Sequence, residues 1–180
     1  MGAGAGTLSS AGKRISSFVA GAGTLSALQM AWCNAAYWFH EALAEPLTTV
    51  AIAKLETAVE NLFGSPSLGE SNSRIRKALK GLFGLEPQDS IVPGSTVTVS
   101  AFVKDIVEAR SRILHGNWST LTEELAMGRG DVAAFARELL VNYTETLGLY
   151  AASGSPVDEA LQFLNWIEMQ RATKASPPPP

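Results

Sequence analysis

Apolar residues recur along most of the chain at the three- and four-residue spacing of helices that bury one face. This pattern predicts helices at 25–44, 46–63, 74–83, 99–114 and 131–150, and a last helix from about 156 to 171. The alternating stretch at 96–100 has no second strand to pair with, so we interpret it as the capped start of the fourth helix. The sequence therefore predicts an all-α bundle of about six helices.

Residues with strong positional preferences mark the ends of these helices. Gly64 and Gly84 are suited to end the second and third helices, because glycine readily takes the left-handed conformation found there. Serine, aspartate and proline mark the starts, since they cap or begin helices. The expected start residues are Pro46, Ser71 or Ser73, Asp131, and the pair Ser155–Pro156 followed by two acids.

The two ends of the chain differ in composition from the helical part. Residues 1–23 are rich in glycine, alanine and serine and predict a flexible arm, whereas 173–180 form a proline-rich tail. The helical domain would then span 24–172. Residues 15–39 carry no charge, but several of them are polar or glycine, so a buried helix is favoured there over a membrane span. We therefore do not expect a membrane partner.

Composition limits the chemistry of the chain. Its 180 residues have a formal net charge of -3, so any binding of nucleic acid would depend on a local basic patch. The single cysteine, Cys33, permits no internal disulfide and indicates a reducing compartment such as the cytoplasm. With only two histidines as well, a zinc site would be unusual, so we expect neither a metal nor another cofactor.

One predicted helix carries a charged residue within its apolar face. Projected at about 100° per residue, the apolar residues of the 99–114 helix share one sector, and Arg110 lies near its centre. An unpaired charge in this position is unfavourable, so Arg110 should meet a carboxylate, a second subunit or an anionic ligand. Glu41 and Glu56, on the first two helices, are the carboxylates that we consider first.

His115 follows Arg110 by five residues. On a continuous helix the two side chains would point about 140° apart and could not meet. Gly116 can end the helix at His115 in the left-handed conformation, which would let the imidazole turn back toward Arg110. The spacing alone favours an ion pair and a histidine at a helix C-terminus over a catalytic pair.

The stretch "RSRILHG", at 110–116, resembles the Arg-x4-His signature of HEPN domains, in the form found in the Apea-like HEPN family. Upstream, "AIAKLETAVENLFG" and "SRIRKALKGLFG" resemble that family's Leu-Glu helix and the basic helix after it. The resemblance covers roughly residues 31–150. Two positions depart from relatives: Ser111 stands where many active HEPN proteins have Asn, Asp or His, and Asn117 where an AMPylated toxin subgroup has tyrosine.

The resemblance implies a metal-independent endoribonuclease that acts as a homodimer, with two Arg-x4-His motifs facing one cleft. RNA would be cleaved by its own 2′-hydroxyl, in a defence or stress response. His115 would act as general base, or as acid from the second subunit, and Arg110 would stabilise charge on the phosphate. Ser111, Asn117 and Glu56 would support these two residues.

Basic residues predict where RNA would lie, although their spread over the helix favours a solvated surface as the explanation. They are Arg74, Arg76, Lys77 and Lys80 on the third helix, and Arg112 beside the motif. Two other functions stay open: a non-catalytic HEPN module that binds RNA or a protein partner, and a plain helical dimerisation protein. Ser111 and the low basicity favour the module, whereas the intact Arg110 and His115 favour the nuclease.

Overall fold

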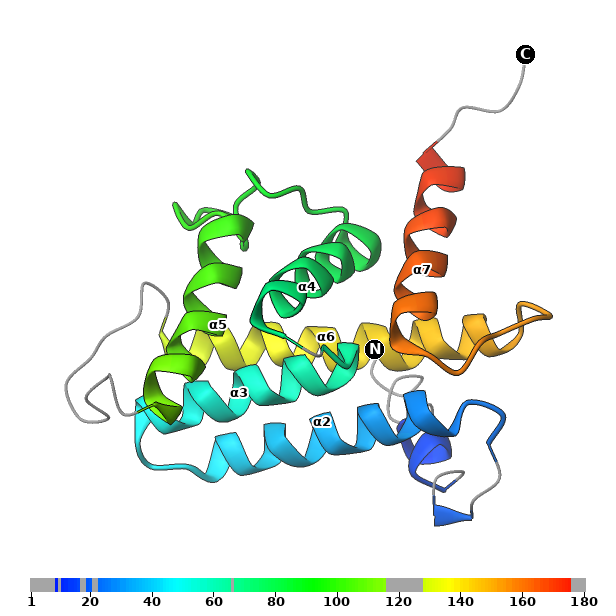
Figure 1. Cartoon of the computed structure of the whole chain (residues 1–180), viewed down its shortest axis with the longest axis horizontal. Helices are drawn as coiled ribbons and strands as arrows, with labels where there is room; N and C mark the ends of the chain where they lie inside the picture. Colours follow the sequence, from blue (N-terminus) through cyan, green and yellow to red (C-terminus); the bar gives the residue numbers. More distant parts are fainter. Residues whose placement is uncertain are drawn as a thin grey trace.

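The computed structural model describes residues 9, 11–16, 19–20, 23–65, 67–115 and 128–175, and its regular structure there is helical. The six labelled helices are α2 (Ser26–Ala44), α3 (Thr48–Phe63), α4 (Leu68–Phe83), α5 (Val99–Leu114), α6 (Arg129–Ala151) and α7 (Ala160–Ala175) (Figure 1). Within the described residues, β-structure is limited to one isolated bridge between Ser90 and Thr98. The all-α prediction is confirmed, and the stretch at 96–100 leads into α5 as expected, with Thr98 as its cap.

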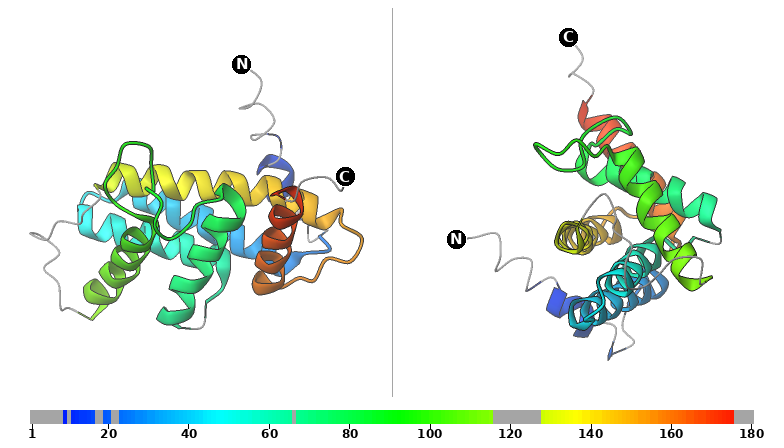
Figure 2. Two further views of the ribbon diagram at one scale, coloured as in Figure 1. Left: turned by 90° about the horizontal axis from the view of Figure 1, so that it is seen from above. Right: turned by 90° about the vertical axis from the view of Figure 1, so that its left-hand side faces the viewer.

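The helices form two layers. α2, α3 and α6 lie side by side in one layer, and α4, α5 and α7 stand across them in the other (Figures 1 and 2). α3 contacts every other labelled helix, and its buried residues cover more than half of its circumference. It is therefore the central helix of the fold, and most polar groups that it carries must find partners inside the protein.

The predicted ends of α3, α4 and α5 are confirmed. Gly64 ends α3 and Gly84 ends α4, with φ of 55° and 75°, the left-handed conformation that glycine adopts with least strain. α5 ends at Leu114, and His115 is its C-terminal cap residue. The ends of α3 and α4 each follow from the backbone preference of a single glycine, which the sequence shows directly.

The predicted starts of α3 and α4 are wrong. Pro46 lies two residues before α3, which begins at Thr48. α4 begins at Leu68 because the hydroxyl of Ser67 accepts the N–H of Glu70 at 3.3 Å, the first half of a Ser-x-x-Glu capping box. Residues 68–73, which precede the predicted helix at 74–83, therefore belong to α4, and Ser71 and Ser73 lie inside it.

The predicted starts of α6 and α7 are also wrong. α6 begins at Arg129, with Gly128 rather than Asp131 as its N-terminal cap residue. The Arg129 guanidinium donates to two carbonyl oxygens at the end of α2, which ties the start of α6 to that helix. α7 begins at Ala160, several residues after the Ser155–Pro156 pair.

Asp158 caps a different helix from the one that its position in the sequence suggests. α2 has no side-chain cap of its own. The Asp158 carboxylate accepts three hydrogen bonds at that end of α2, from the N–H of Ala27 (2.8 Å), the N–H of Leu28 (3.0 Å) and the hydroxyl of Ser26 (3.2 Å). A residue from the loop before α7 thus satisfies donors that helix geometry leaves unpaired.

We expect Asp158→Ala to lower the free energy of unfolding by about 1 kcal/mol, because the first turn of α2 loses its acceptor and a favourable negative charge. Urea denaturation followed by circular dichroism would measure this loss. The matched control is Glu159→Ala, which removes an exposed acid from the next position. An equal loss in both variants would contradict the capping role of Asp158.

The ends of the chain are partly described. Within the expected flexible arm, residues 11–16 are helical, and the Arg14 guanidinium donates to the hydroxyl and the carbonyl of Thr144 in α6. α7 continues to Ala175, so it takes in the first residues of the expected tail. None of the helices that the structure describes is long and apolar enough to cross a membrane.

Candidate functional site

α5 presents the Arg-x4-His motif at its C-terminal half. Its apolar residues Phe102, Val103, Ile106 and Val107 are buried against α3 and α4, as the helical projection predicts. Arg110 lies on the same side of the helix, and 26% of its side chain is exposed. The guanidinium therefore lies at the edge of the α3–α5 contact, where it needs partners.

α3 provides those partners. Arg110 Nε lies 3.3 Å from Glu56 Oε2, and Arg110 Nη1 pairs with the carboxylate of Glu60. The expected contact with Glu56 is confirmed. The expected contact with Glu41 is wrong, because that carboxylate lies 3.9 Å from Lys54, beside the α2–α3 turn.

Glu60 is a member of the site that the sequence analysis missed. It follows Glu56 by four residues, so the two carboxylates lie on the same side of α3, one turn apart. Once Glu56 had been chosen as a partner for Arg110, this spacing could have identified Glu60 as well. The three side chains form one cluster, which we call the Arg110 cluster.

Glu56 is the most buried charged residue of this cluster. Its exposed fraction is 0%, and neither carboxylate oxygen has a hydrogen-bond partner, although Arg110 Nε lies within ion-pair distance. Burial, with the nearby Glu60 carboxylate, raises the pKa of Glu56 to about 8 against the opposing charge of Arg110. At neutral pH Glu56 is therefore mainly protonated, and the shorter ion-pair contact of Arg110 is the one with Glu60.

The burial of Glu56 predicts an unusual dependence of the free energy of unfolding on pH. The native state keeps the Glu56 proton up to about pH 8, whereas an unfolded glutamate releases it near its ordinary pKa of 4.5. Since the native state binds more protons between these values, Glu56 lowers the free energy of unfolding as pH rises through this window.

We expect Glu56→Gln, which resembles the protonated acid, to remove this loss. Its free energy of unfolding relative to wild type should increase from pH 5 to pH 8.5 by an amount on the order of 1 kcal/mol or more. Urea denaturation across that range would measure the difference. A constant difference between the two proteins would contradict a protonated Glu56, and Glu45→Gln provides a control at a carboxylate outside the cluster.

His115 is exposed at the end of α5. The backbone N–H of His115 donates to the Ser111 carbonyl at 3.1 Å, so the backbone still follows the helix at this residue. The imidazole therefore leaves the helix about 140° around from Arg110, as on a continuous helix. The structure does not bring Arg110 and His115 together within one copy of the chain.

The other residues of the motif have different positions. Ser111 is half-buried, and its carbonyl is the one that accepts the His115 N–H. Arg112 is mostly exposed and pairs with Glu108 one turn earlier, at 3.1 Å. Gly116, expected to end the helix in the left-handed conformation, and Asn117, expected to support catalysis, both lie outside the described residues.

The four basic residues of α4 separate into two groups. Arg74 donates to the carbonyls of Phe63 (2.8 Å) and Gly64 (2.6 Å) and pairs with Glu70, so it is engaged at the end of α3. Arg76, Lys77 and Lys80 instead line one small cavity near the start of α5. The structure thus brings three of the four predicted RNA-binding cations together and places the fourth elsewhere.

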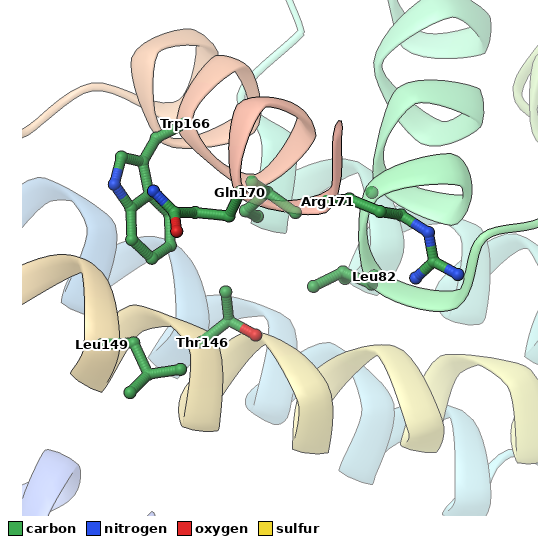
Figure 3. A pocket seen from close by; sticks show the side chains of 8 residues that line it. Leu82, Thr146, Leu149, Trp166, Gln170 and Arg171 are labelled. Carbon is green, nitrogen blue, oxygen red and sulfur yellow. The ribbon is translucent and has the colours of Figure 1, made fainter. Parts of the chain in front are cut away.

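A larger open pocket lies between α4, α6 and α7. It has a volume of about 310 Å³ and is lined mainly by Leu82, Thr146, Leu149, Trp166, Gln170 and Arg171 (Figure 3). None of the residues predicted to act on RNA lines it. In the described parts of the chain, no group of three or more His, Cys, Asp or Glu residues is placed to hold a metal ion.

Comparison with known proteins adds no relative: no family model matches the chain, and no curated protein or solved structure matches it significantly. The features of this chain that bear on its function are therefore the Arg110 cluster, His115 and the cations of α4.

Proposed function

We propose that this protein is a metal-independent endoribonuclease of the HEPN type, which cleaves RNA at a site shared by two copies of the chain. The observation that carries the proposal is how Arg110 is held. Its contacts with Glu56 and Glu60 use Nε and Nη1, while Nη2 has no partner among the described residues. The guanidinium is thus oriented by α3, remains a quarter exposed, and can donate to an anion.

His115 supplies the second chemical group. It is exposed at the C-terminal cap of the same helix, and an imidazole can both accept and donate a proton. In the proposed reaction an imidazole nitrogen removes the proton of the ribose 2′-hydroxyl, whose oxygen attacks the adjacent phosphorus. Arg110 stabilises the negative charge on the non-bridging oxygens. The bond to the 5′-oxygen then breaks, which leaves a 2′,3′-cyclic phosphate and a 5′-hydroxyl.

The directions of these side chains explain why two copies would be needed. Arg110 and His115 of one chain leave α5 on different sides, so one phosphate cannot contact both of them easily. If two copies of α5 pack around a two-fold axis, Arg110 of one copy can face His115 of the partner subunit. The partner's His115 can also protonate the leaving 5′-oxygen.

The test is a cleavage assay of the purified full chain on single-stranded RNA in the presence of EDTA. We expect cleavage, products with cyclic phosphate and 5′-hydroxyl ends, and a rate per chain that rises with the dimer fraction measured by sedimentation. Absence of cleavage where dimer is present, or cleavage that needs added Mg²⁺, would overturn the proposal.

A second candidate, a non-catalytic module that binds RNA or a protein partner, is favoured by one observation. The two carboxylates of the Arg110 cluster already give Arg110 partners, so the arginine can serve stability alone. RNA binding without cleavage in the same assay would favour this candidate.

A further inference from the structure

Three cations of α4 line a cavity of about 190 Å³ beside the loop that precedes α5. We call this cavity the basic pocket; its lining residues are Arg76, Lys77, Lys80, Leu85, Glu86, Pro87 and Val99. The cations come from one side of α4, at consecutive and four-residue spacing, and the other residues come from 85–99. The pocket therefore depends on the folded loop as well as on the helix.

Arg76 has donors that the protein does not use. Its Nε is buried without a hydrogen-bond partner. Its Nη2 lies 3.4 Å from the carbonyl oxygen of Ser100, beyond the usual length of such a bond. Because a guanidinium offers five N–H donors, and a buried donor without an acceptor is unfavourable, an anion in the pocket would improve the environment of Arg76.

Both lysines are held in place by acids. Lys77 Nζ lies 3.1 Å from the carboxylate of Glu168, and Lys80 Nζ lies 3.0 Å from that of Glu86. Lys77 Nζ also donates to Asn165 Oδ1, so it keeps one donor for a ligand, whereas Lys80 Nζ keeps two. Arg171 approaches the neighbouring end of α4, where its guanidinium fills the space that a side chain at Gly84 would need. Figure 3 shows this arginine directed away from Trp166 and toward α4.

The size of the basic pocket limits what it can hold. It is smaller than the cavities of about 300–1,000 Å³ that enclose drug-sized ligands, so a whole nucleotide would not fit. A phosphate group is small, anionic and rich in acceptors, and arginine and lysine are the side chains that usually bind it. The three lining cations outnumber the two acids that pair with the lysines, so the local charge favours an anion.

We propose that the basic pocket binds a backbone phosphate of the RNA strand. That the phosphate belongs to RNA rests on the proposed function, whereas the affinity of the pocket for a phosphate group does not. The pocket lies at the N-terminal end of α5, and His115 lies at the other end, 15 residues or roughly 22 Å beyond Ser100. At a rise of about 3.4 Å per stacked nucleotide, this distance places the phosphate in the pocket about six nucleotides from the cleaved bond.

The experiment measures binding of a fluorescent 12-nucleotide single-stranded RNA to the full chain carrying His115→Ala, so that cleavage cannot interfere. We expect Arg76→Gln and Lys80→Gln each to weaken binding about tenfold and to reduce the slope of log affinity against log salt by roughly 0.7. Arg137→Gln and Lys104→Gln are matched controls, since they remove the same charges from exposed positions outside the pocket. Equal effects of pocket and control variants would overturn the inference.

Two further measurements distinguish the possible outcomes. Glu86→Gln removes the acid that competes for Lys80 and should tighten binding severalfold, which a purely structural role of the pocket would not produce. Inorganic phosphate should compete with RNA more strongly than chloride of the same ionic strength. If phosphate binds but RNA affinity is unchanged by the pocket variants, the assignment to RNA is wrong. If wild type cleaves RNA but the pocket variants bind it as tightly as the parent protein, this inference alone is overturned. If RNA binding depends on the pocket but wild type cleaves no RNA, only the proposed nuclease activity is overturned.

Discussion

His115→Ala should reduce the rate of RNA cleavage by at least about a hundredfold, because general acid–base catalysis by a positioned side chain contributes about that much. The imidazole is exposed and forms part of no described ion pair or side-chain hydrogen bond, so the fold should tolerate its removal. Single-turnover cleavage in EDTA would measure the change. His40→Ala is the matched control, because His40 is the other histidine of the chain and is also exposed.

A mixture of two inactive variants tests whether the site is shared between copies. In a heterodimer of His115→Ala with Arg110→Met, one of the two composite sites has both its arginine and its histidine. Random exchange of subunits should then restore about a quarter of the wild-type activity. Circular dichroism would verify that each variant is folded. No recovery of activity would contradict a shared site, and cleavage by His115→Ala alone at the wild-type rate would exclude His115 from catalysis.

Much of the fold follows from local properties of the sequence. The buried face of α5 was predictable because apolar residues recur at helical spacing, and the ends of α3 and α4 because Gly64 and Gly84 can adopt positive φ. The cap of α2 and the start of α6 were less predictable, since they involve distant residues. Asp158 caps α2 from the loop before α7, and Arg129 binds the end of α2.

In the candidate site, too, some features were predictable from local sequence and others depended on distant residues. The position of Arg110 in the apolar sector of α5 indicated that it needs a partner, and the choice of Glu56 was correct. The four-residue spacing from Glu56 could also have indicated Glu60, whereas the sequence could not exclude Glu41, because that depends on which helix α5 packs against. The basic pocket was not predictable either: Arg74 and Arg76 are two residues apart, and only the folded loop at 85–99 determines which of them lines a cavity.

Arg110→Met should lower the free energy of unfolding by about 3 kcal/mol at pH 9, since it leaves the buried Glu56 carboxylate without its positive partner. Methionine keeps most of the apolar stem, so the loss reports on the charge rather than on packing. At pH 6 the loss should be smaller, because protonated Glu56 no longer carries an uncompensated charge. Urea denaturation at the two pH values would measure both.

Arg112→Met is the matched control for this prediction, because Arg112 lies two residues further along α5 and 54% of its side chain is exposed. It should change stability by no more than about 0.5 kcal/mol. In a double-mutant cycle, Arg110→Met should cost less at pH 9 when Glu56→Gln is already present, since the buried charge has been removed. Equal costs in the two backgrounds, or a loss independent of pH, would mean that Glu56 and Arg110 do not stabilise each other. The stability of the α3–α5 contact would then depend on Glu60 and apolar packing alone.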